Sequence, residues 1–477
     1  MPASPDKPVP ASPDKKDGWL ESLRSTVQRT DPALLGLVVA SLALGVYLVS
    51  NSDRGNFYNH FVWQAQAFID GRAAIAYPVS EGPNVNAYFQ DVMPVPGQPG
   101  RGWIPFPPLP ALALVPLVLL AGLDADASLL AVLLGAVNVA LAWRMALLLT
   151  TNRLAALLAT VFFAFGTVHW YAAMLGSTWF LAHVVAVTFV IASISVALDG
   201  ELRPRARSAL AAGRGAVRGW LAWFEPRQFI AGLLLGIGAL ARLPVIFGAP
   251  FLLFVGAGGS YRARALSAGI GAVIPVLLLV GYNLATTGHL FHPAYQFLYE
   301  HEYLGYLPPA GCHEAFPRQL CEFLTINRDF AITDPRHVPL NALILLAWPP
   351  VIRPECGLEL LAPSCSVVRP DPIGMSILLT SPAYLLAAPL LAAGWRRRLV
   401  AGAGLAVAAI ALVNLMHFSQ GWVQFGYRFS NDFLPFGMVL VTIAIARMGV
   451  RPLAVALVAV SVLVNAWGVY WGVRLGW

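Results

Sequence analysis

Long apolar runs recur along the chain and predict an all-α polytopic membrane protein. Each run is continuous over about 15 to 22 residues, close to the ~20 that a helix needs to cross a bilayer. Several runs are shorter than this. We expect about eleven transmembrane helices, at 31–50, 127–149, 154–170, 179–198, 228–242, 244–259, 266–285, 373–394, 399–417, 432–447 and 452–473.

The spans divide the chain into four parts. Residues 1–30 form a polar tail in which PASPDK occurs twice, and we expect it to be disordered and cytoplasmic. An N-terminal transmembrane module, 31–285, contains a first outer loop at 51–126. An outer loop region at 286–372 separates it from a C-terminal transmembrane module, 373–477.

Positive charge gives the orientation of the spans. The formal net charge is +7, but all three lysines lie in the tail and arginines recur at the ends of apolar runs. This distribution indicates topology and not a nucleic-acid surface. With the N-terminus inside, the short basic turns are cytoplasmic and the two long loops face outward. Abundant Ala, Arg, Val and Leu with few lysines favour a GC-rich bacterial source, so we expect a plasma-membrane protein.

The run 106–122, FPPLPALALVPLVLLAG, is apolar enough to suggest another span. Counting it would place the six arginines between 203 and 227 outside and the cysteines inside. We therefore predict an outer-face juxtamembrane helix that lies in or dips into the outer leaflet. A true span at 106–122 remains the alternative.

All four cysteines fall in the loop 286–372, which places that loop in an oxidising compartment if they form disulfides. Four cysteines allow three pairings. Equal spacing favours Cys312 with Cys321 and Cys356 with Cys365.

The first outer loop carries the catalytic candidates. Asp53 follows the first span and precedes an amphipathic surface helix, where a carboxylate can meet the headgroup of a lipid-borne substrate. The alternative is a helix cap or a pair with Arg54. Asp91, in FQDV, is the second catalytic candidate, and His60 in the surface helix is a candidate for substrate binding.

A second candidate region is HFSQGWVQFGYRFSNDFLPF, residues 417–436. Arg428 stands there beside Tyr427 and Gln424, and a guanidinium among aromatic neighbours suits a lipid phosphate. The alternative is a structural pair between Arg428 and Asp432. Arg242, in ALARLP, is a second outer-edge arginine in an apolar context.

The segment 282–297 leaves the seventh span as YNLATTGHLFHPAYQF. Asn283 and Tyr295 are candidates for binding sugar hydroxyls, together with His289 and His292. Ordinary interfacial residues are the alternative for the histidines. The histidines are scattered and lack paired spacing with the cysteines, so a zinc site is not expected.

The order of these elements resembles the GT-C superfamily of membrane glycosyltransferases, such as protein O-mannosyltransferases and aminoarabinose transferases. The shared features are an acidic residue after the first span, a surface helix ending in Gly71-Arg72 and a Pro-Pro-Leu segment before the second span. The resemblance implies an outward-facing site, a polyprenyl-phosphate sugar donor and a catalytic aspartate in the first loop. Relatives commonly show Asp-Glu where this chain has Asp53-Arg54, and alignment from Gly71 would place Asn56 there.

The segment YAAMLGSTWFLAH lacks the second acidic motif of some relatives, so we expect no divalent metal and no cofactor. The expected partners are the lipid-linked donor, a glycan, lipid or protein acceptor, and membrane lipids, without nucleic acid. A transporter or flippase of lipid-linked sugars is the alternative function, and a non-catalytic scaffold is a third.

Overall fold

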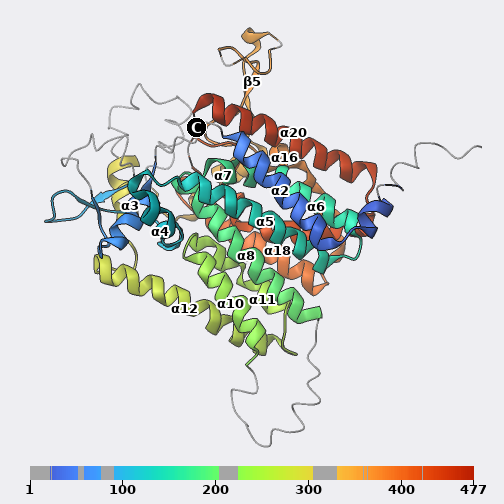
Figure 1. Ribbon diagram of the computed structural model, residues 1–477, viewed down its shortest axis with the longest axis horizontal. Coiled ribbons are helices and arrows are strands. Elements are labelled where there is room, and N and C mark those ends of the chain that lie inside the picture. Colours follow the sequence, from blue (N-terminus) through green and yellow to red (C-terminus); the bar gives the residue numbers. More distant parts are fainter. Residues whose placement is uncertain are drawn as a thin grey trace, which may run out of the picture.

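The computed structural model describes residues 22, 24–51, 58–76, 91–202, 224–303, 330–357, 359–362, 364–421 and 423–476 (Figure 1). Asp53, Asn56, Cys312 and Cys321 lie outside these ranges, as do the tail 1–20 and Trp422. The predictions that concern them are therefore untested.

Helices dominate the described part of the chain, and seven of them are long and apolar enough to cross a membrane. They are α2 (Pro32–Ser50), α5 (Ala127–Leu149), α8 (Thr178–Leu202), α12 (Tyr261–Thr287), α18 (Arg398–Leu415), α19 (Ser430–Met448) and α20 (Pro452–Leu475). An eighth candidate is the pair α6 (Arg153–Phe165) and α7 (His169–Leu175), which is bent by 50°. The chain is thus a multi-pass membrane protein, as the hydrophobic pattern predicted.

Shorter elements connect the long helices. They are α3 (His60–Ile69), α4 (Leu109–Ala121), η1 (Gly122–Asp124), α10 (Pro226–Ala239), η3 (Leu243–Gly248), α11 (Ala249–Phe254), α13 (Ala294–Phe297), η4 (Leu298–Tyr303), η5 (Pro335–His337), α15 (Val338–Ala347), η6 (Pro354–Cys356), α16 (Ile377–Thr380), η7 (Pro382–Leu386) and α17 (Ala387–Gly394). The strands are β1 (Ile75–Ala76), β2 (Met93–Pro94), β3 (Arg101–Trp103), β4 (Val351–Ile352) and β5 (Val368–Arg369).

The predicted count of about eleven spans is not confirmed. Seven predicted spans coincide with the seven long helices, and an eighth, 154–170, contains the bend between α6 and α7. The other three correspond to the 14-residue α10, to η3 with α11, and to the broken series α16, η7 and α17. A 14-residue helix is about 21 Å long, which is less than the ~30 Å hydrocarbon core.

Local sequence explains where the long helices begin. Pro32 occupies the first turn of α2, and the Asp31 carboxylate caps it by accepting hydrogen bonds from the backbone of Ala33 and Leu34. Asp126 caps α5 in the same way, through the backbone N–H of Ser128. Polar residues at the apolar boundaries therefore define the helix ends.

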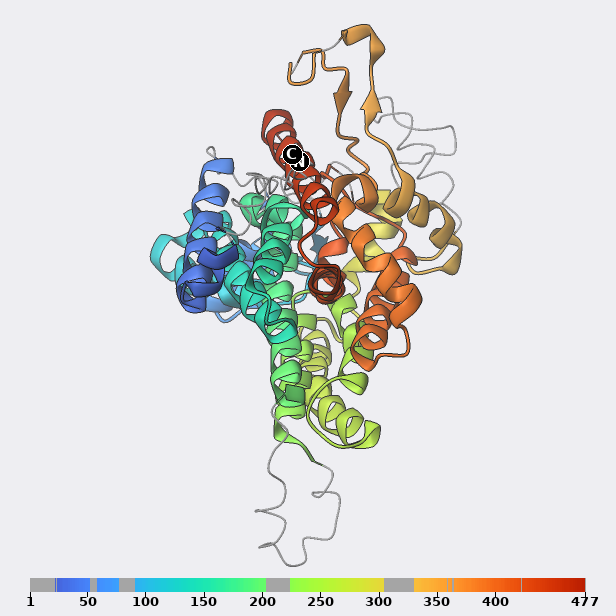
Figure 2. The same cartoon turned by 90° about the vertical axis from the view of Figure 1, so that its right-hand side faces the viewer.

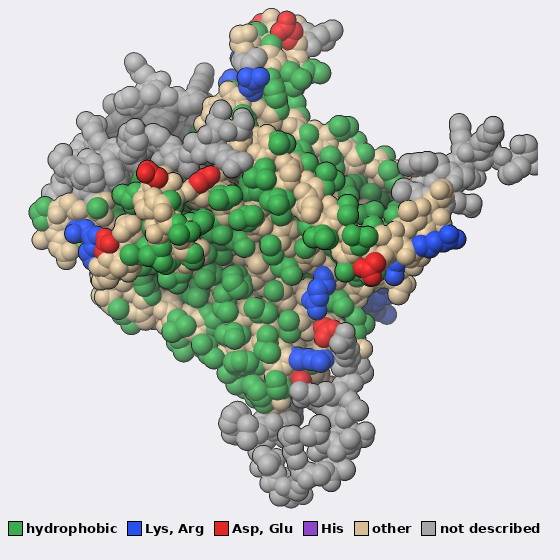
Figure 3. Space-filling view, viewed as in Figure 1, with side chains coloured by type: hydrophobic (Ala, Val, Ile, Leu, Met, Phe, Trp, Pro, Cys, Tyr) green, Lys and Arg blue, Asp and Glu red, His purple; other side chains and the backbone are tan. Residues whose placement is uncertain are grey.

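The long helices differ in how deeply they are buried. α8 and α19 form the centre of the bundle, because 78% and 83% of their apolar windows are buried. α2 and α12 lie at the periphery, with only 22% buried. Hydrophobic side chains cover the middle of the face seen in Figure 3, as expected of a surface in contact with lipid.

The two ends of the bundle differ in chemistry. At one end, Arg398 lies 3.6 Å from Glu201 at the finish of α8, and Arg227 lies 3.9 Å from Asp199. The disulfide-bonded hairpin of β4 and β5 projects from the opposite end (Figure 2). Arg227, Arg398 and the disulfide-bonded hairpin are thus at opposite ends of the bundle. Which end faces outward stays a prediction of the charge pattern.

The segment 51–126, predicted as the first outer loop, contains the helix α3, a small sheet and the helix α4 in its described part. β1, β3 and β2 pair antiparallel in that order, and a small core of Ala67, Ile75, Val92 and Ile104 lies beneath them. The 13 residues of α4 span about 20 Å, too short to cross a bilayer. A helix is present where a surface helix was predicted, at 106–122; its position relative to lipid stays a prediction.

The segment 286–372, predicted as the second outer loop, contains one of the predicted disulfides. Cys356 and Cys365 are bonded, with Cα atoms 5.1 Å apart, at the tip of the hairpin formed by β4 and β5. This pairing is the one favoured by the equal spacing of the cysteines. The proposed pair Cys312–Cys321 lies outside the described residues.

Glycines allow α10 and α12 to approach closely. A Cβ atom at Gly232 would lie 2.0 Å from the carbonyl oxygen of Ala268, and one at Gly236 would lie 2.5 Å from that of Ala272. Small residues spaced four apart are the usual means of close helix contact in membranes.

We predict that Gly232→Ala lowers the thermal unfolding temperature of the purified protein, because the added methyl overpacks this contact at a cost of about 1–3 kcal/mol. The matched control is Gly281→Ala, where a Cβ atom on α12 would meet nothing within 4 Å. A Gly232→Ala protein as stable as the control would contradict the close contact.

We also predict the orientation of the two ends. A cysteine at Glu359, in the hairpin, should react with an impermeant thiol reagent in intact cells, whereas one at Arg397 should react only after lysis. Reaction of Arg397→Cys in intact cells would show that the basic end faces outward.

Candidate functional site

The centre of the candidate site is the carboxylate of Asp432, in the first turn of α19. It accepts hydrogen bonds from Arg242 Nε at 3.2 Å and Arg242 Nη2 at 2.9 Å. His183 Nδ1 on α8 lies at 2.8 Å, and Asn414 Nδ2 on α18 at 3.1 Å. Asp432 and His183 are fully buried, so this carboxylate ties together α8, α18, α19 and the end of α10.

Arg242 is the ion-pair partner of Asp432, and Arg428 occupies a different environment. The guanidinium of Arg428 lies over the rings of Trp179, Phe180 and Phe429, at 6.0, 5.7 and 5.3 Å from their centroids. The alternative of a structural pair between Arg428 and Asp432 is therefore wrong, because Asp432 pairs with Arg242. Arg428 precedes the first turn of α19, so the four-residue spacing is not a helical one.

Both arginines nevertheless converge on one ring. The Arg242 guanidinium lies 5.0 Å from the centroid of Phe429, and that of Arg428 lies 5.3 Å from it. Both side chains are half-buried. Arg242 directs Nε and Nη2 to Asp432, and its Nη1 has no hydrogen-bond partner among the described residues. The arrangement brings two guanidinium groups together at one aromatic ring.

Asp91 joins the same site through Trp179. The indole Nε1 donates a hydrogen bond of 2.8 Å to Asp91 Oδ2, and the same indole lies beneath Arg428. Asp91 directly precedes Val92 in the small core of the first loop, so the sheet there holds it in place. The structure thus brings the second catalytic candidate next to the arginines.

The pKa values of two tyrosines are shifted by the charges of the site. Burial raises the pKa of Tyr58, and the negative charge of Asp91 raises it further. Burial also raises the pKa of Tyr295, with the Arg242 charge acting against this and the Asp91 charge adding to it. Tyr295 is therefore within electrostatic range of both Arg242 and Asp91.

Backbone strain is concentrated here. Asp91 and Val423, with φ of 62° and 54°, are the two non-glycine residues with positive φ in the described ranges. Such conformations are disfavoured for a β-branched residue and tend to occur at functional sites. Both border the site, one beside Trp179 and the other in the segment that carries Arg428.

Gln424 and Tyr427 hold this segment in shape. Gln424 Nε2 donates to the carbonyls of Ile373 and Gln420, at 2.7 and 2.8 Å, and the Tyr427 hydroxyl donates to Gln420 Oε1. Both candidates are fully buried. In this structure they position the chain around Arg428 and do not face an open site.

His60 and Asn283 also lie within the protein framework. His60 is fully buried, with Nδ1 2.9 Å from Thr178 Oγ1, in a cluster of aromatic rings. Asn283 Nδ2 donates to the carbonyl of Leu290, so it orders the exit of α12. Burial lowers the pKa of His292 to about 4.

Sequence reasoning overlooked three side chains: His183, Asn414 and Trp179. A usable signal was present for His183, because a polar residue inside an otherwise apolar span indicates a partner in the protein interior. No local signal identified Trp179, because its contacts, with Asp91, Arg428, Tyr58 and His60, come from residues far away in the chain. In the ranges that the structure describes, no three His, Cys, Asp or Glu side chains form a group suited to a metal ion.

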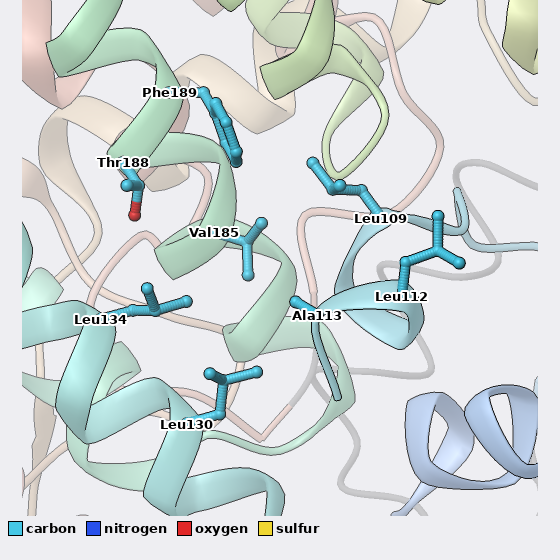
Figure 4. A pocket seen from close by; sticks show the side chains of 8 residues that line it. All are labelled: Leu109, Leu112, Ala113, Leu130, Leu134, Val185, Thr188 and Phe189. Atoms are coloured by element: carbon cyan, nitrogen blue, oxygen red, sulfur yellow. The ribbon is translucent and has the colours of Figure 1, made fainter. Parts of the chain in front are cut away.

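An apolar groove opens beside the site. Leu109, Leu112 and Ala113 of α4, Leu130 and Leu134 of α5, and Val185, Thr188 and Phe189 of α8 enclose about 340 Å³ (Figure 4). The backbone of Leu109 donates to the carbonyl of Leu240, two residues before Arg242. The Leu109 end of the groove therefore lies near the chain segment that carries Arg242.

No model of a known protein family matches this chain. No curated protein sequence matches it significantly.

Among solved structures, the chain is similar to the oligosaccharyltransferase of Archaeoglobus fulgidus. The apo form has 12% identity and a TM-score of 0.46, with 92% of this chain and 55% of that chain covered. A form tethered via a disulfide bond to an acceptor peptide containing the NVT sequon has 12% identity and a TM-score of 0.47, with the same coverage of both chains. A third structure, AglB in complex with an inhibitory peptide and a dolichol-phosphate, has 11% identity and a TM-score of 0.47. The match covers 93% of this chain and 56% of that chain.

All three solved structures are of an archaeal oligosaccharyltransferase. This chain spans about 55% of their length. At identities of 11–12% and TM-scores below 0.5, the likeness carries no conclusion about activity, so function has to be inferred from the residues of this chain.

Proposed function

We propose that this protein is a GT-C type membrane glycosyltransferase that moves a sugar from a polyprenyl-phosphate donor to an acceptor hydroxyl on the outer face of the membrane. The observation that carries the proposal is the convergence of Arg242 and Arg428 on Phe429, with Asp91 joined to them through Trp179. The site combines cations for a phosphate with a carboxylate for a hydroxyl.

The arginines are assigned to the donor phosphate. A planar guanidinium matches phosphate oxygens in pairs and is less strongly hydrated than an ammonium, so it functions at a lipid boundary. Asp432 fixes Arg242 in one orientation, and three aromatic rings surround Arg428. Cations fixed in advance stabilise the charge that develops on the departing phosphate oxygen.

The groove between α4, α5 and α8 is assigned to the lipid of the donor. Seven of its eight lining side chains are hydrophobic, and the eighth is Thr188. Its Leu109 end lies near the segment that carries Arg242, and we assign the groove to the isoprenoid chain of a donor whose phosphate is held by the arginines. An apolar groove in this place supports a lipid-linked donor over a water-soluble nucleotide sugar.

A carboxylate of the first outer loop is assigned as the general base. It takes the proton of the acceptor hydroxyl, whose oxygen attacks the anomeric carbon. The bond from that carbon to the phosphate oxygen breaks, and polyprenyl phosphate departs with the electron pair. Asp91 is the candidate within the described site, and Asp53 remains the candidate suggested by the family resemblance.

This single displacement would invert the anomeric configuration. We propose that it proceeds without a divalent metal, because two arginines supply the positive charge that a metal would otherwise provide. Glycans, lipids and proteins all carry hydroxyls that could serve as the acceptor. The bacterial plasma membrane is the proposed location.

We predict that Asp91→Asn reduces turnover at least ~100-fold, because loss of a general base costs about 10²- to 10⁴-fold. Transfer from a synthetic polyprenyl-phosphate sugar measures it, with EDTA present in a parallel assay. Asp53→Asn is the matched variant. If Asp91→Asn retains full turnover and Asp53→Asn does not, the base is Asp53; if both retain it, the assignment of a first-loop carboxylate is wrong.

We predict that Arg428→Lys raises the donor KM about tenfold or more, because a point charge cannot replace a charged hydrogen-bonding fork of about 1.5–3 kcal/mol. Thermal stability should change little. Arg242→Ala should lower both donor affinity and stability, because it leaves Asp432 buried without its cation, at a cost of about 3–5 kcal/mol.

The control for both arginine variants is Arg474→Lys, on α20, whose guanidinium lies over Tyr470. It should leave donor KM and stability unchanged. An unchanged donor KM in Arg428→Lys and Arg428→Ala would remove Arg428 from the phosphate site.

A further inference from the structure

A second pair of arginines lies on the disulfide-bonded hairpin, away from Asp432. Val351 of β4 pairs with Arg369 of β5, and the backbone N–H of Arg353 donates to the carbonyl of Val367 at 2.8 Å. Side chains alternate along a strand, so Arg353 and Arg369 share one face as diagonal neighbours. The bond between Cys356 and Cys365 closes the hairpin just beyond them.

Their donors are buried and unsatisfied. Nε and Nη2 of Arg353 and Nε of Arg369 are shielded from solvent and have no hydrogen-bond partner in the described part of the chain. A buried donor without a partner costs about 1–3 kcal/mol, and more when it is charged. Two like charges side by side add repulsion, so the face is unfavourable unless an anion binds to it.

The carboxylate of Asp371 acts on Arg369 but is already engaged. Asp371 accepts a hydrogen bond of 2.9 Å from the backbone of Ile373, and a second from Trp348. Burial lowers the pKa of Arg369, and the positive charge of Arg353 lowers it further, whereas Asp371 opposes this. The face thus keeps a net positive charge next to a partly neutralising carboxylate.

We infer that the face formed by Arg353 and Arg369 is a binding site for a phosphate group. A carboxylate has two oxygens in one plane and matches a single guanidinium fork, whereas a tetrahedral phosphate can present oxygens to two guanidiniums at once. The phosphate could be a free ion or the headgroup of a lipid, since both offer the same oxygens. The site uses none of the residues assigned to the donor, so it stands independently of the proposed glycosyl transfer.

The site is nevertheless connected to the arginine cluster of the bundle. The chain continues from Arg369 to Pro372, whose carbonyl accepts the backbone N–H of Gln424 at 3.2 Å. Two residues later, a Cβ atom at Gly374 would lie 2.7 Å from the carbonyl oxygen of Gly426. The chain that follows the hairpin is thus in backbone contact with the segment that carries Arg428.

The test is a thermal unfolding titration of the purified full chain with inorganic phosphate, at constant ionic strength set with chloride. Phosphate should raise the unfolding temperature of the unmodified protein. In Arg353→Met and Arg369→Met, the apparent phosphate affinity should fall at least tenfold. Without phosphate these variants should be as stable as the parent or more so, because they remove unsatisfied charges.

The matched control is Arg336→Met, at an exposed arginine paired with Asp334 at 2.8 Å, which should keep the phosphate response. If a methionine variant fails to fold, Arg353→Lys and Arg369→Lys replace it and should weaken phosphate binding.

A second arm distinguishes the source of the phosphate. The chain is reconstituted into bilayers of zwitterionic lipid with or without a lipid bearing a phosphomonoester headgroup. A response to free phosphate supports the ion, and a response only to the phosphomonoester lipid supports a headgroup site. Equal behaviour of parent and arginine variants in both arms would overturn the inference.

Discussion

The buried ion pair between Asp432 and Arg242 is the interaction on which the rest of the site depends. A carboxylate without exposure inside a bundle is tolerated only if its oxygens are satisfied, and here Arg242, His183 and Asn414 satisfy them. These partners come from different helices. The requirement to satisfy one charge therefore fixes where α8, α18, α19 and the end of α10 meet.

The functional geometry follows from that constraint. Because Asp432 holds Arg242 at the end of α10, its guanidinium lies over Phe429, and Arg428 approaches the same ring from the neighbouring residue. The hydrogen bond between Trp179 and Asp91 then ties the first outer loop to the bundle. A structural ion pair in the interior thus supports a pair of cations at its edge. This division of roles explains why Arg242 and Arg428 are not interchangeable.

The sequence predicted those features that depend on local chemistry. Apolar runs gave the seven long helices, equal spacing favoured the Cys356–Cys365 bond, and arginines marked the end opposite the cysteine hairpin. Arg428 was recognised because a guanidinium among aromatic residues suits a lipid phosphate, Arg242 because of its apolar context, and Asp91 as the second carboxylate of the first loop. The number of spans was not predicted as well. The helices α10, α16 and α17 are shorter than the apolar runs in which they lie.

Pairings between distant residues were not predictable. The nearest candidate partner of Asp432 along the chain was Arg428, yet the structure uses Arg242, which is 190 residues away. The burial of His60, Gln424 and Tyr427 was equally invisible in the sequence. His60 contacts the Thr178 hydroxyl, Gln424 donates to backbone carbonyls, and Tyr427 donates to the side-chain oxygen of Gln420. Sequence patterns report what a residue can do, whereas burial decides whether it is available to a ligand.

The central claim is that Arg242 and Arg428 bind one phosphate at the edge of the bundle. A cryo-EM structure of the protein in a lipid nanodisc with polyprenyl phosphate tests it most directly. The account predicts phosphate density within hydrogen-bonding distance of Arg428 and of Arg242 Nη1, with the isoprenoid chain entering the groove between α4, α5 and α8. Phosphate density elsewhere, with both arginines unchanged and the groove empty, would contradict it.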